Sequence, residues 1–447
     1  MGQRTRMLTE IFGFDGWQVT GAYFENAAGE RVEVVRGYAP LRSTRLVLVV
    51  ARRWMARCSE CTAPCRRRHE WLPTRRWADL SWAGHSVAIE YTACRVKCSK
   101  CKGAPVEMVG WAEPYQRQSR RLQQHLAVQA ASMPVMHVAA LHGLSWLTVR
   151  RAEEWAIERW ERTRPPVPLR DVGVDEKWLG RRNKLDDKFV TIVSNLETGE
   201  PLWIGYGRSE KTLKQWLALL TPEHKAAIRL FAMDMHRPFM NAVRDDPALA
   251  RVPIVHDPFH VIKRAGEAIT ELRRQTFFRA GADLRALGRG TRWLVLRPWA
   301  KTSEEQREQL RLLFSFNARL ARAYQLVEQL RDALHAPDFM SMLAGISLVL
   351  RRTRRHDNVP MRKLHDSLLD HLPEIVALGE YHPRTGRIEA LNNNWETLVR
   401  RARGYRNHQY LLRKLRFMVA NPIRSTDGIK RFLALGLPPP VPMPHAA

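Results

Sequence analysis

The 447-residue sequence has few acidic residues, few cysteines and no long apolar run. It holds 45 Asp and Glu against 73 Lys and Arg, and the resulting formal charge of +28 indicates a polyanionic partner. The longest uncharged apolar stretch, residues 46–51, has the length of a strand and not the roughly 18 residues of a membrane-spanning helix. The first residues also lack the apolar core of a signal peptide. We therefore expect a soluble, cytoplasmic protein.

The apolar content disfavours intrinsic disorder. Hydrophobic residues make up 45% of the chain and include 15 Trp and 14 Phe. This much apolar surface can offset the entropy lost when the chain folds. At roughly 100–200 residues per domain, we expect about two to four domains.

The six cysteines are grouped instead of being scattered along the chain. Cys58 and Cys61 form one CxxC pair, and Cys98 and Cys101 form a second pair that follows a strand-like segment. A two-residue gap lets both thiolates of a turn reach one zinc ion about 2.3 Å away. The spacing is therefore typical of a structural zinc site and not of a disulfide framework. We predict that these four thiolates hold zinc in a β-rich module over residues 1–115.

Other ligand sets remain open. Cys65 and Cys94 lie close to the two pairs, and His69 or His85 could replace a thiolate. A chain without zinc is a further alternative. The basic and aromatic run between the pairs, which includes residues 65–77, suits phosphate contact and base stacking, although a solvated charged loop would have the same composition.

The hydrophobic period becomes helical from residue 118 to residue 162. Gly143 interrupts this period, and Ser145 is of the residue type that begins a helix. Two helices joined by so short a turn indicate a helix-turn-helix within residues 116–165. A plain helical hairpin is the alternative.

The second of these helices would present one face to DNA. The side chains that we expect in the major groove are Trp146, Thr148 and Arg150. Leu147 and Val149 would instead pack against the preceding helices. A proline-rich run then ends this domain, because proline interrupts a helix interior.

Strand-like and helical segments follow in the order β-β-β-α-β-α-β within residues 166–265. Asp175 ends the first strand of this series and Asp234 ends the fourth. That order places the two strands side by side in an RNase H-like α/β sheet, so the two carboxylates meet. Paired carboxylates can hold Mg²⁺ ions about 3.5–4 Å apart for phosphodiester chemistry. The alternative is that each aspartate caps a helix or turn.

A third carboxylate is expected on a helix near the C-terminus. Glu389, Asn393, Glu396 and Arg400 share one side of that helix by the i, i+4, i+7 rule. Glu389 is the expected ligand, and Glu396 is a rival that could instead pair with Arg400. The arginines that would line a phosphate track are Arg400, Arg401, Arg403 and Arg406.

Several short blocks of residues together carry a resemblance to a known family. The blocks are Val174-Asp175-Glu176, Ala232-Met233-Asp234-Met235, residues 255–264 and residues 386–393, followed by residues 404–407. In this order, and behind the cysteine pairs and the helix-turn-helix, they resemble the DDE transposases of the bacterial ISL-three insertion-sequence family. The resemblance covers most of the chain, from about residue 40 to about residue 420.

The resemblance implies a transposase that binds the terminal inverted repeats of its insertion sequence, cuts the DNA strands there and joins them to target DNA. It implies that Asp175, Asp234 and Glu389 form a catalytic triad that holds Mg²⁺ or Mn²⁺. The partner would be double-stranded DNA, bound by a homodimer or a larger assembly associated with the bacterial nucleoid. The rivals are a non-catalytic DNA-binding descendant of such an enzyme and a nuclease that does not join strands.

Three further residues could support the active site. Asp257 and His260 resemble a secondary signature of related transposases, and Asn393 lies one turn beyond Glu389. The alternative is that Asp257 caps the following helix and that His260 is buried and hydrogen-bonded.

These expectations combine into a multidomain α+β protein. The largely helical, arginine-rich stretch would be an insertion domain that interrupts the catalytic core. The expected segments are the β-rich zinc module (1–115), the helix-turn-helix (116–165), the first part of the core (166–265), the helical insertion (266–380) and the C-terminal part of the core (381–447).

Overall fold

The computed structural model describes residues 3–32, 45–113, 115–179, 188–277, 282–354, 356, 358–402, 405 and 407–434. The chain divides into two compact units. The N-terminal unit comprises Met1–Pro165, Val399–Tyr405 and Asn421–Ala447. The central unit comprises Pro166–Leu398 and Arg406–Ala420.

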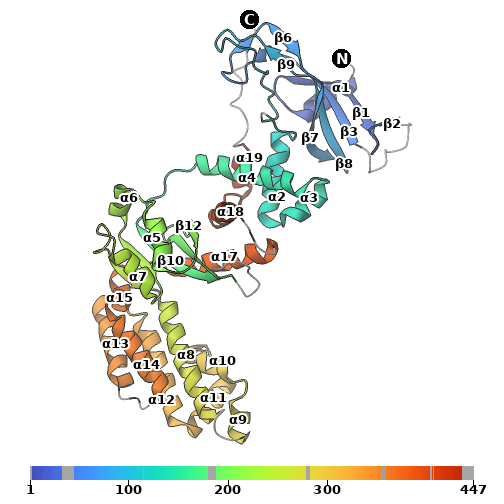
Figure 1. Cartoon of the computed structure of the whole chain (residues 1–447). Helices are drawn as coiled ribbons and strands as arrows, with labels where there is room; N and C mark the ends of the chain where they lie inside the picture. Colours follow the sequence, from blue (N-terminus) through green and yellow to red (C-terminus); the bar gives the residue numbers. More distant parts are fainter. Residues whose placement is uncertain are drawn as a thin grey trace. The chain divides into compact units, whose positions relative to one another are not determined.

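A five-stranded sheet with the order β2-β1-β3-β8-β7 forms the base of the N-terminal unit (Figure 1). Its strands are β1 (Trp17–Glu25), β2 (Arg31–Val32), β3 (Arg45–Arg52), β7 (Arg75–Trp82) and β8 (His85–Tyr91). The pairing is antiparallel except between β3 and β8, which run parallel. The fully buried Trp111 packs its ring against Trp17, Trp77 and Tyr91, so aromatic side chains fill the core beneath the sheet.

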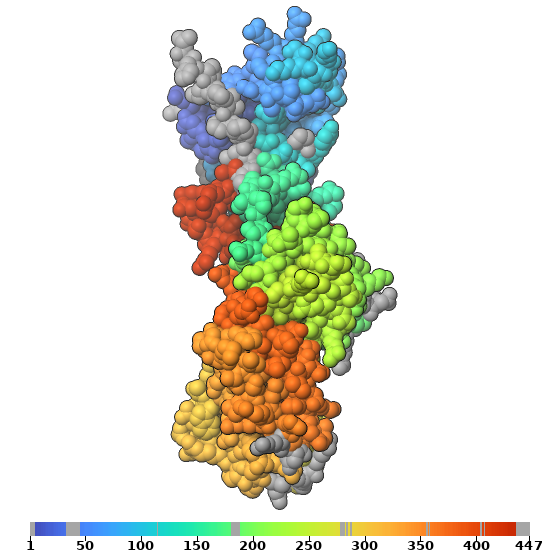
Figure 2. Space-filling view, turned by 90° about the vertical axis from the view of Figure 1, so that its left-hand side faces the viewer, coloured from blue at the N-terminus to red at the C-terminus, as the bar shows by residue number. Residues whose placement is uncertain are grey.

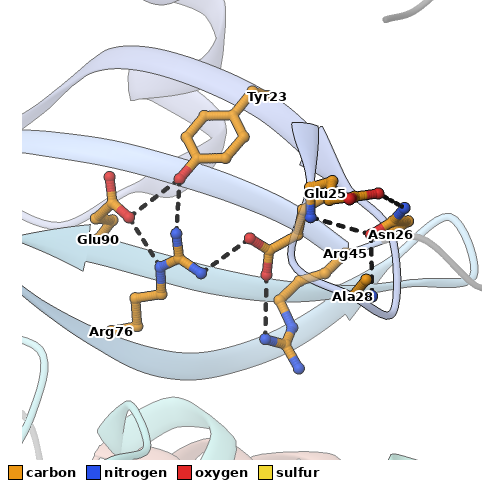
Figure 3. A network of polar contacts seen from close by, with 8 residues as sticks. Tyr23, Glu25, Asn26, Ala28, Arg45, Arg76 and Glu90 are labelled. Atoms are coloured by element: carbon orange, nitrogen blue, oxygen red, sulfur yellow. Dashed lines mark hydrogen bonds and ion pairs between the residues drawn. The ribbon is translucent and has the colours of Figure 1, made fainter. Parts of the chain in front are cut away.

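One face of this sheet carries a network of ion pairs (Figure 3). Arg76 contacts Glu25 at 2.8 Å, Glu90 at 2.8 Å and the Tyr23 hydroxyl at 2.9 Å. Arg45 lies 3.2 Å from the other oxygen of Glu25, a residue only 2% exposed. The network joins β1, β3, β7 and β8. Removal of Arg76 would leave the Glu25 carboxylate buried with one cation fewer, which is costly.

Four short strands lie beside the sheet, and two of them contain a cysteine, Cys65 or Cys94. They are β4 (Ala56–Arg57), β5 (Pro64–Cys65), β6 (Arg68–Trp71) and β9 (Cys94–Val96). The remaining helices at the two ends of the described chain are α1 (Gln3–Phe12) and α19 (Thr426–Ala434), and both belong to the N-terminal unit.

Three helices follow the strands of the N-terminal unit: α2 (Arg120–Ser132), α3 (Val135–His142) and α4 (Trp146–Arg162). Gly143 adopts the left-handed conformation, with φ 60°, and ends α3. The Ser145 side chain accepts a hydrogen bond from the backbone of Thr148 and begins α4. The predicted turn and N-cap are thus confirmed.

The packing expected for Leu147 is wrong. This side chain is 44% exposed, whereas Val149 is fully buried as expected. The buried positions of α4 recur every three or four residues from Val149 onward. Leu147 precedes Val149 by two residues and therefore lies on the opposite side of the helix.

A second five-stranded sheet, with the order β12-β11-β10-β13-β14, forms the base of the central unit. Its strands are β10 (Asp171–Trp178), β11 (Phe189–Asn195), β12 (Pro201–Tyr206), β13 (Leu230–Met233) and β14 (Ile254–His256). β12, β11 and β10 are antiparallel, whereas β10, β13 and β14 are parallel. The first and fourth strands are therefore neighbours, as their order along the chain indicated.

Helices cover both faces of this sheet. Val172 and Val174 of β10 pack with residues of α5 (Glu210–Leu217) and α7 (Arg237–Arg244). On the other face, Ile388 of α17 (Gly386–Ala402) packs with Leu230 and Ala232 of β13. The short α6 (Pro222–Ala227) leads into β13, and α18 (His408–Ala420) contacts β12. Alternate residues of β10 therefore face different helices.

A helical body follows β14, and α8 (Pro258–Phe277) leads into it (Figure 1). Its other members are α9 (Ala282–Gly288), α10 (Arg292–Leu296), the 3-10 turn Trp299–Lys301, α11 (Glu304–Phe316), α12 (Ala318–Ala333), α13 (Phe339–Arg354), α14 (Val359–Asp370), α15 (Leu372–Val376) and α16 (Leu378–Tyr381). All of these except α9 contribute to one hydrophobic core, and Figure 2 shows their yellow and orange surfaces packed against one another. Among the described residues, no helix has the length and apolarity needed to cross a membrane.

We predict that Gly173→Ala destabilises the central unit. A β-carbon at this position of β10 would lie 2.6 Å from Ser194 Oγ, 2.8 Å from Leu196 Cδ2 and 3.1 Å from Ile388 Cγ1. Overpacking of this kind costs about 1–3 kcal/mol of unfolding free energy. Chemical denaturation measures the loss.

Gly386→Ala is the matched control, because nothing lies within 4 Å of a β-carbon at that position. Equal denaturation midpoints for Gly173→Ala and the unchanged protein would contradict the close approach of α17 to β10.

Candidate active site and cysteine cluster

Asp175 lies on β10 with only 7% of its surface exposed. Asn392 Nδ2 of α17 donates a hydrogen bond of 2.5 Å to Asp175 Oδ2, and the backbone N–H of Glu176 donates one of 2.8 Å to Oδ1. His260 Nε2 of α8 lies 3.9 Å from the same Oδ1. Two helices from distant parts of the sequence therefore hold this carboxylate in place.

Asp234 follows β13 directly and has a different environment. Among the atoms of the described residues, its Oδ1 is buried without a hydrogen-bond partner. Burial, followed by the charges of Glu176 and Asp175, raises the pKa of Asp234 to about 7. The structure thus brings Asp175 and Asp234 close enough for their charges to interact. A buried, unpaired carboxylate oxygen beside further carboxylates fits a divalent cation, which supplies the missing partner and opposite charge.

The third predicted triad member, Glu389, lies on α17. Glu389 is exposed in the first turn of α17, and it belongs to no cluster of potential metal ligands within the described part of the chain. Asn392, one turn further on, makes the contact with Asp175. The rival Glu396 lies 3.4 Å from Lys177 of β10, and Asn393 is exposed. The hydrogen bond from α17 to Asp175 therefore comes from the side-chain amide of Asn392.

Asp257 begins α8. Its Oδ1 accepts a hydrogen bond of 3.0 Å from the backbone N–H of Phe259, which is a helix-capping contact. Burial raises the pKa of Asp257, and a hydrogen bond from Thr385, just before α17, opposes this shift. His260 is half-buried and points toward Asp175. Asp257 thus caps α8, as the alternative interpretation of the sequence expected. His260 instead lies beside Asp175 in the candidate active site.

Four cysteines of the N-terminal unit converge. Cys58 and Cys101 Sγ lie 3.8 Å apart, Cys61 and Cys98 Sγ lie 3.5 Å apart, and all four sulfurs lie within 4.8 Å of one another. The backbone N–H of Cys101, above all, lowers the pKa of Cys98 to about 6. A thiolate stabilised in this way is a suitable metal ligand. This cysteine cluster can therefore bind a zinc ion in the tetrahedral manner.

The other candidate ligands do not belong to the cysteine cluster. Cys65 Sγ lies 3.5 Å from the carbonyl oxygen of Ala63, and Cys94 Sγ lies 3.8 Å from Arg52 Nη2. Burial raises the pKa of both thiols, to about 11 for Cys94. Neither belongs to the group of four sulfurs that lie within 4.8 Å of one another.

The predicted DNA-contacting face of α4 is only partly free. The Trp146 ring is 46% exposed. Thr148 Oγ1 lies 2.8 Å from the Ser145 hydroxyl, and Arg150 forms an ion pair of 3.0 Å with Glu154. Trp146 is thus the most accessible of the three predicted side chains, whereas Thr148 and Arg150 already have partners within the helix.

The arginines predicted to line a phosphate track do not share one environment. Arg401 Nη1 donates a hydrogen bond of 3.0 Å to the backbone carbonyl of Ala131, near the C-terminal end of α2. Arg400 is exposed. Arg403 and Arg406 lie outside the described residues. Arg401 therefore supports the fold of the N-terminal unit.

Sequence reasoning missed two side chains beside Asp234. Glu176 and His236 each place a ligand atom within 4.8 Å of the other and of Asp234. In a regular strand, Glu176 would point to the opposite face from Asp175. The signals that could have found them are an acidic residue next to Asp175 and a histidine two residues after Asp234.

Comparison with known proteins assigns the family. Residues 172–415 match the model of the ISL3 DDE transposase domain, described as a transposase. Residues 107–153 match the helix-turn-helix domain of transposase family ISL3. The predicted helix-turn-helix is thereby confirmed.

Two relatives span nearly the whole chain. The transposase for insertion sequence element IS1001 of Bordetella parapertussis is 27% identical over 414 residues, which cover 92% of this chain and 97% of the relative. The transposase for insertion sequence element IS1557 of Mycobacterium tuberculosis is 25% identical over 444 residues, which cover 92% and 94%. Because the transposase model matches more than half of the sequence, this chain belongs to the ISL3 family of DDE transposases.

Proposed function

We propose that this transposase cleaves DNA at the ends of its insertion sequence and joins the freed ends to target DNA. The observation that carries the proposal is the buried, unpaired Oδ1 of Asp234, which interacts with the charge of Asp175 on the neighbouring parallel strand. In a member of a transposase family, such a pair is best explained as a site for Mg²⁺ or Mn²⁺.

An RNase H-like core is part of this proposal. Its support is the strand order, with three antiparallel strands followed by two that run parallel to β10. The helices from α9 to α16 separate Asp234 from Glu389 along the chain, and we assign them to an insertion domain over residues 266–380. The core would then comprise residues 166–265 and 381–447.

Asp175, Asp234 and Glu389 are the proposed catalytic triad. Bound metal would stabilise the negative charge that develops on the phosphate oxygens. Asn392 orients Asp175 through its hydrogen bond, and α17 also carries Glu389 one turn earlier. His260 lies beside Asp175, where it can hydrogen-bond to the carboxylate or to the DNA.

Two phosphoryl transfers would follow. In the first, the oxygen of a water molecule bonds to the scissile phosphorus, and the strand is released with a 3′-hydroxyl end. In the second, that 3′-oxygen bonds to a phosphorus of the target DNA and displaces a target 3′-oxygen, which takes up a proton. No covalent intermediate with the protein forms.

The N-terminal unit would recognise the terminal inverted repeats. Its helix-turn-helix places the exposed Trp146 at the start of α4, and the cysteine cluster, with zinc bound, would hold the neighbouring basic strands. Two copies of the chain would bring two element ends together. The net charge of +28 suits contact with DNA on the bacterial nucleoid.

The first prediction concerns catalysis. Asp234→Asn removes a metal-binding carboxylate but keeps its shape, so DNA cleavage with Mg²⁺ should fall by at least about 10²-fold. End binding in a gel-shift assay should remain. Asp245→Asn is the control, because this carboxylate is exposed and forms an ion pair of 2.7 Å with Lys214. Loss of binding and cleavage together would show instead that Asp234 is structural.

A second prediction concerns zinc. The purified protein should contain one zinc per chain by elemental analysis, and Cys98→Ser should lose it and melt at a lower temperature. Cys65→Ser should keep its zinc, because Cys65 lies outside the cysteine cluster. Zinc loss in Cys65→Ser at wild-type stability would mean that the ligand set is different.

A third prediction concerns DNA recognition. Trp146→Ala should weaken binding to inverted-repeat DNA by about tenfold, within the range of about 1–3 kcal/mol for one base contact. Trp293→Ala is the control, because this tryptophan of α10 is 72% exposed in the helical body. Equal affinities of the two variants, measured by fluorescence anisotropy, would exclude Trp146 from the interface.

A further inference from the structure

Three side chains from different elements of the central unit lie together beside the proposed triad. Glu176 is on β10, Asp234 follows β13, and His236 immediately precedes α7. One ligand atom from each lies within 4.8 Å of those of the other two. We call this group the Glu–Asp–His cluster.

Each member of the Glu–Asp–His cluster has an unsatisfied polar atom. Within the described chain, Glu176 Oε2, Asp234 Oδ1 and His236 Nδ1 are all buried without a hydrogen-bond partner. His236 occupies the N-cap position of α7, yet its side chain makes no capping hydrogen bond. Buried polar groups normally have partners, so three unsatisfied atoms in one place indicate a missing ligand.

The surroundings hold these side chains in place. Arg208 Nη1 lies 3.5 Å from Glu176 Oε1, so the guanidinium engages the oxygen that is not the unsatisfied one. Arg208 in turn lies over the ring of Phe189, and the His236 ring packs edge-on against Phe239 at 4.6 Å. These contacts fix the positions of Glu176 and His236 from outside the cluster.

The charges in the cluster favour a cation. It contains two carboxylates and an imidazole, whose ring nitrogens are common metal ligands. Arg208 occupies only one oxygen of Glu176. A divalent ion bound by one ligand atom of each residue would neutralise the carboxylates.

We propose that Glu176, Asp234 and His236 bind one divalent transition-metal ion, for which Mn²⁺ is the probe. The reason is the imidazole: nitrogen ligands suit transition metals, whereas Mg²⁺ prefers oxygen ligands alone. This inference depends on the proposed function in one respect, which is that Asp234 belongs both to the proposed triad and to the Glu–Asp–His cluster. Glu176 and His236 are then metal ligands in addition to the triad.

The contacts of Asp175 support a metal site whose ligands are Glu176, Asp234 and His236, without Asp175. Asn392 and the backbone of Glu176 already engage one oxygen of Asp175 each. Glu176 and His236 therefore offer the unsatisfied atoms around Asp234, and Asp175 does not.

The test measures Mn²⁺ binding to the full-length chain without DNA, by electron paramagnetic resonance. The unchanged protein should bind Mn²⁺ more tightly than Mg²⁺ in competition, and pulsed spectra should show coupling to a coordinated nitrogen. Glu176→Gln and His236→Gln should weaken Mn²⁺ binding by at least about tenfold, because even the loss of an outer hydrogen-bond partner costs 10–100-fold. The nitrogen coupling should disappear in His236→Gln.

His224→Gln is the matched control, since this histidine of α6 is exposed and lies outside the cluster. Thermal melting identifies any variant that fails to fold, and the nitrogen coupling of the folded Glu176→Gln variant then provides a second readout. It should persist, because His236 remains a ligand.

Two results would overturn the inference. In one, Glu176→Gln and His236→Gln bind Mn²⁺ normally while Asp175→Asn does not, which would leave the proposed triad intact. In the other, the unchanged protein binds no Mn²⁺ or shows no nitrogen coupling. Mg²⁺-dependent cleavage by the same preparation would then decide separately whether the proposed function stands.

Discussion

The parallel pairing of β10 with β13 is the constraint on which the candidate active site depends. It sets Val174 opposite Met233, and the next residue on each strand is an aspartate. Two carboxylates are thereby held close together in a place with little access to water, where burial and repulsion both disfavour the charged form of Asp234. The raised pKa of Asp234 is the result, and bound cations would reverse it.

Two helices contact Asp175 of this strand pair. α17 approaches β10 closely because Gly173 has no side chain, and Asn392 then reaches Asp175. α8 begins at Asp257 and brings His260 to the same carboxylate. Thr385, at the start of α17, interacts with Asp257, so the two helices are also linked to each other. A site assembled from such distant segments requires the whole central unit to fold.

The N-terminal unit has a separate stabilising centre. Glu107, only 2% exposed, accepts hydrogen bonds from the Tyr91 hydroxyl and the backbone of Cys94 and pairs with Arg52 at 2.6 Å. This contact joins β3 and β8 of the main sheet to β9, the strand that precedes Cys98 of the cysteine cluster. Cys94 is thus a buried member of the fold beside the cluster, which explains a cysteine that fits neither CxxC pair.

Local sequence determined a large part of this protein. The spacing of Cys58, Cys61, Cys98 and Cys101 predicted their grouping, and Gly143 and Ser145 predicted the turn before α4, because ligand reach and helix capping depend on neighbouring residues. The order of strands likewise predicted that β10 and β13 are neighbours. The assignment of Glu389 to the triad stays a prediction.

Only the tertiary structure decided which side chains surround Asp234. The alternation of side chains along a strand predicts facing only within that strand. It therefore could not predict that Glu176 of β10 and His236, which lies beyond the end of β13, meet beside Asp234. The rotation of a helix about its own axis is also set by packing, and this turned Asn392 toward Asp175 and Leu147 toward solvent. The order of residues therefore determined the helices and strands, and the packing between them determined which side chains meet at the candidate active site.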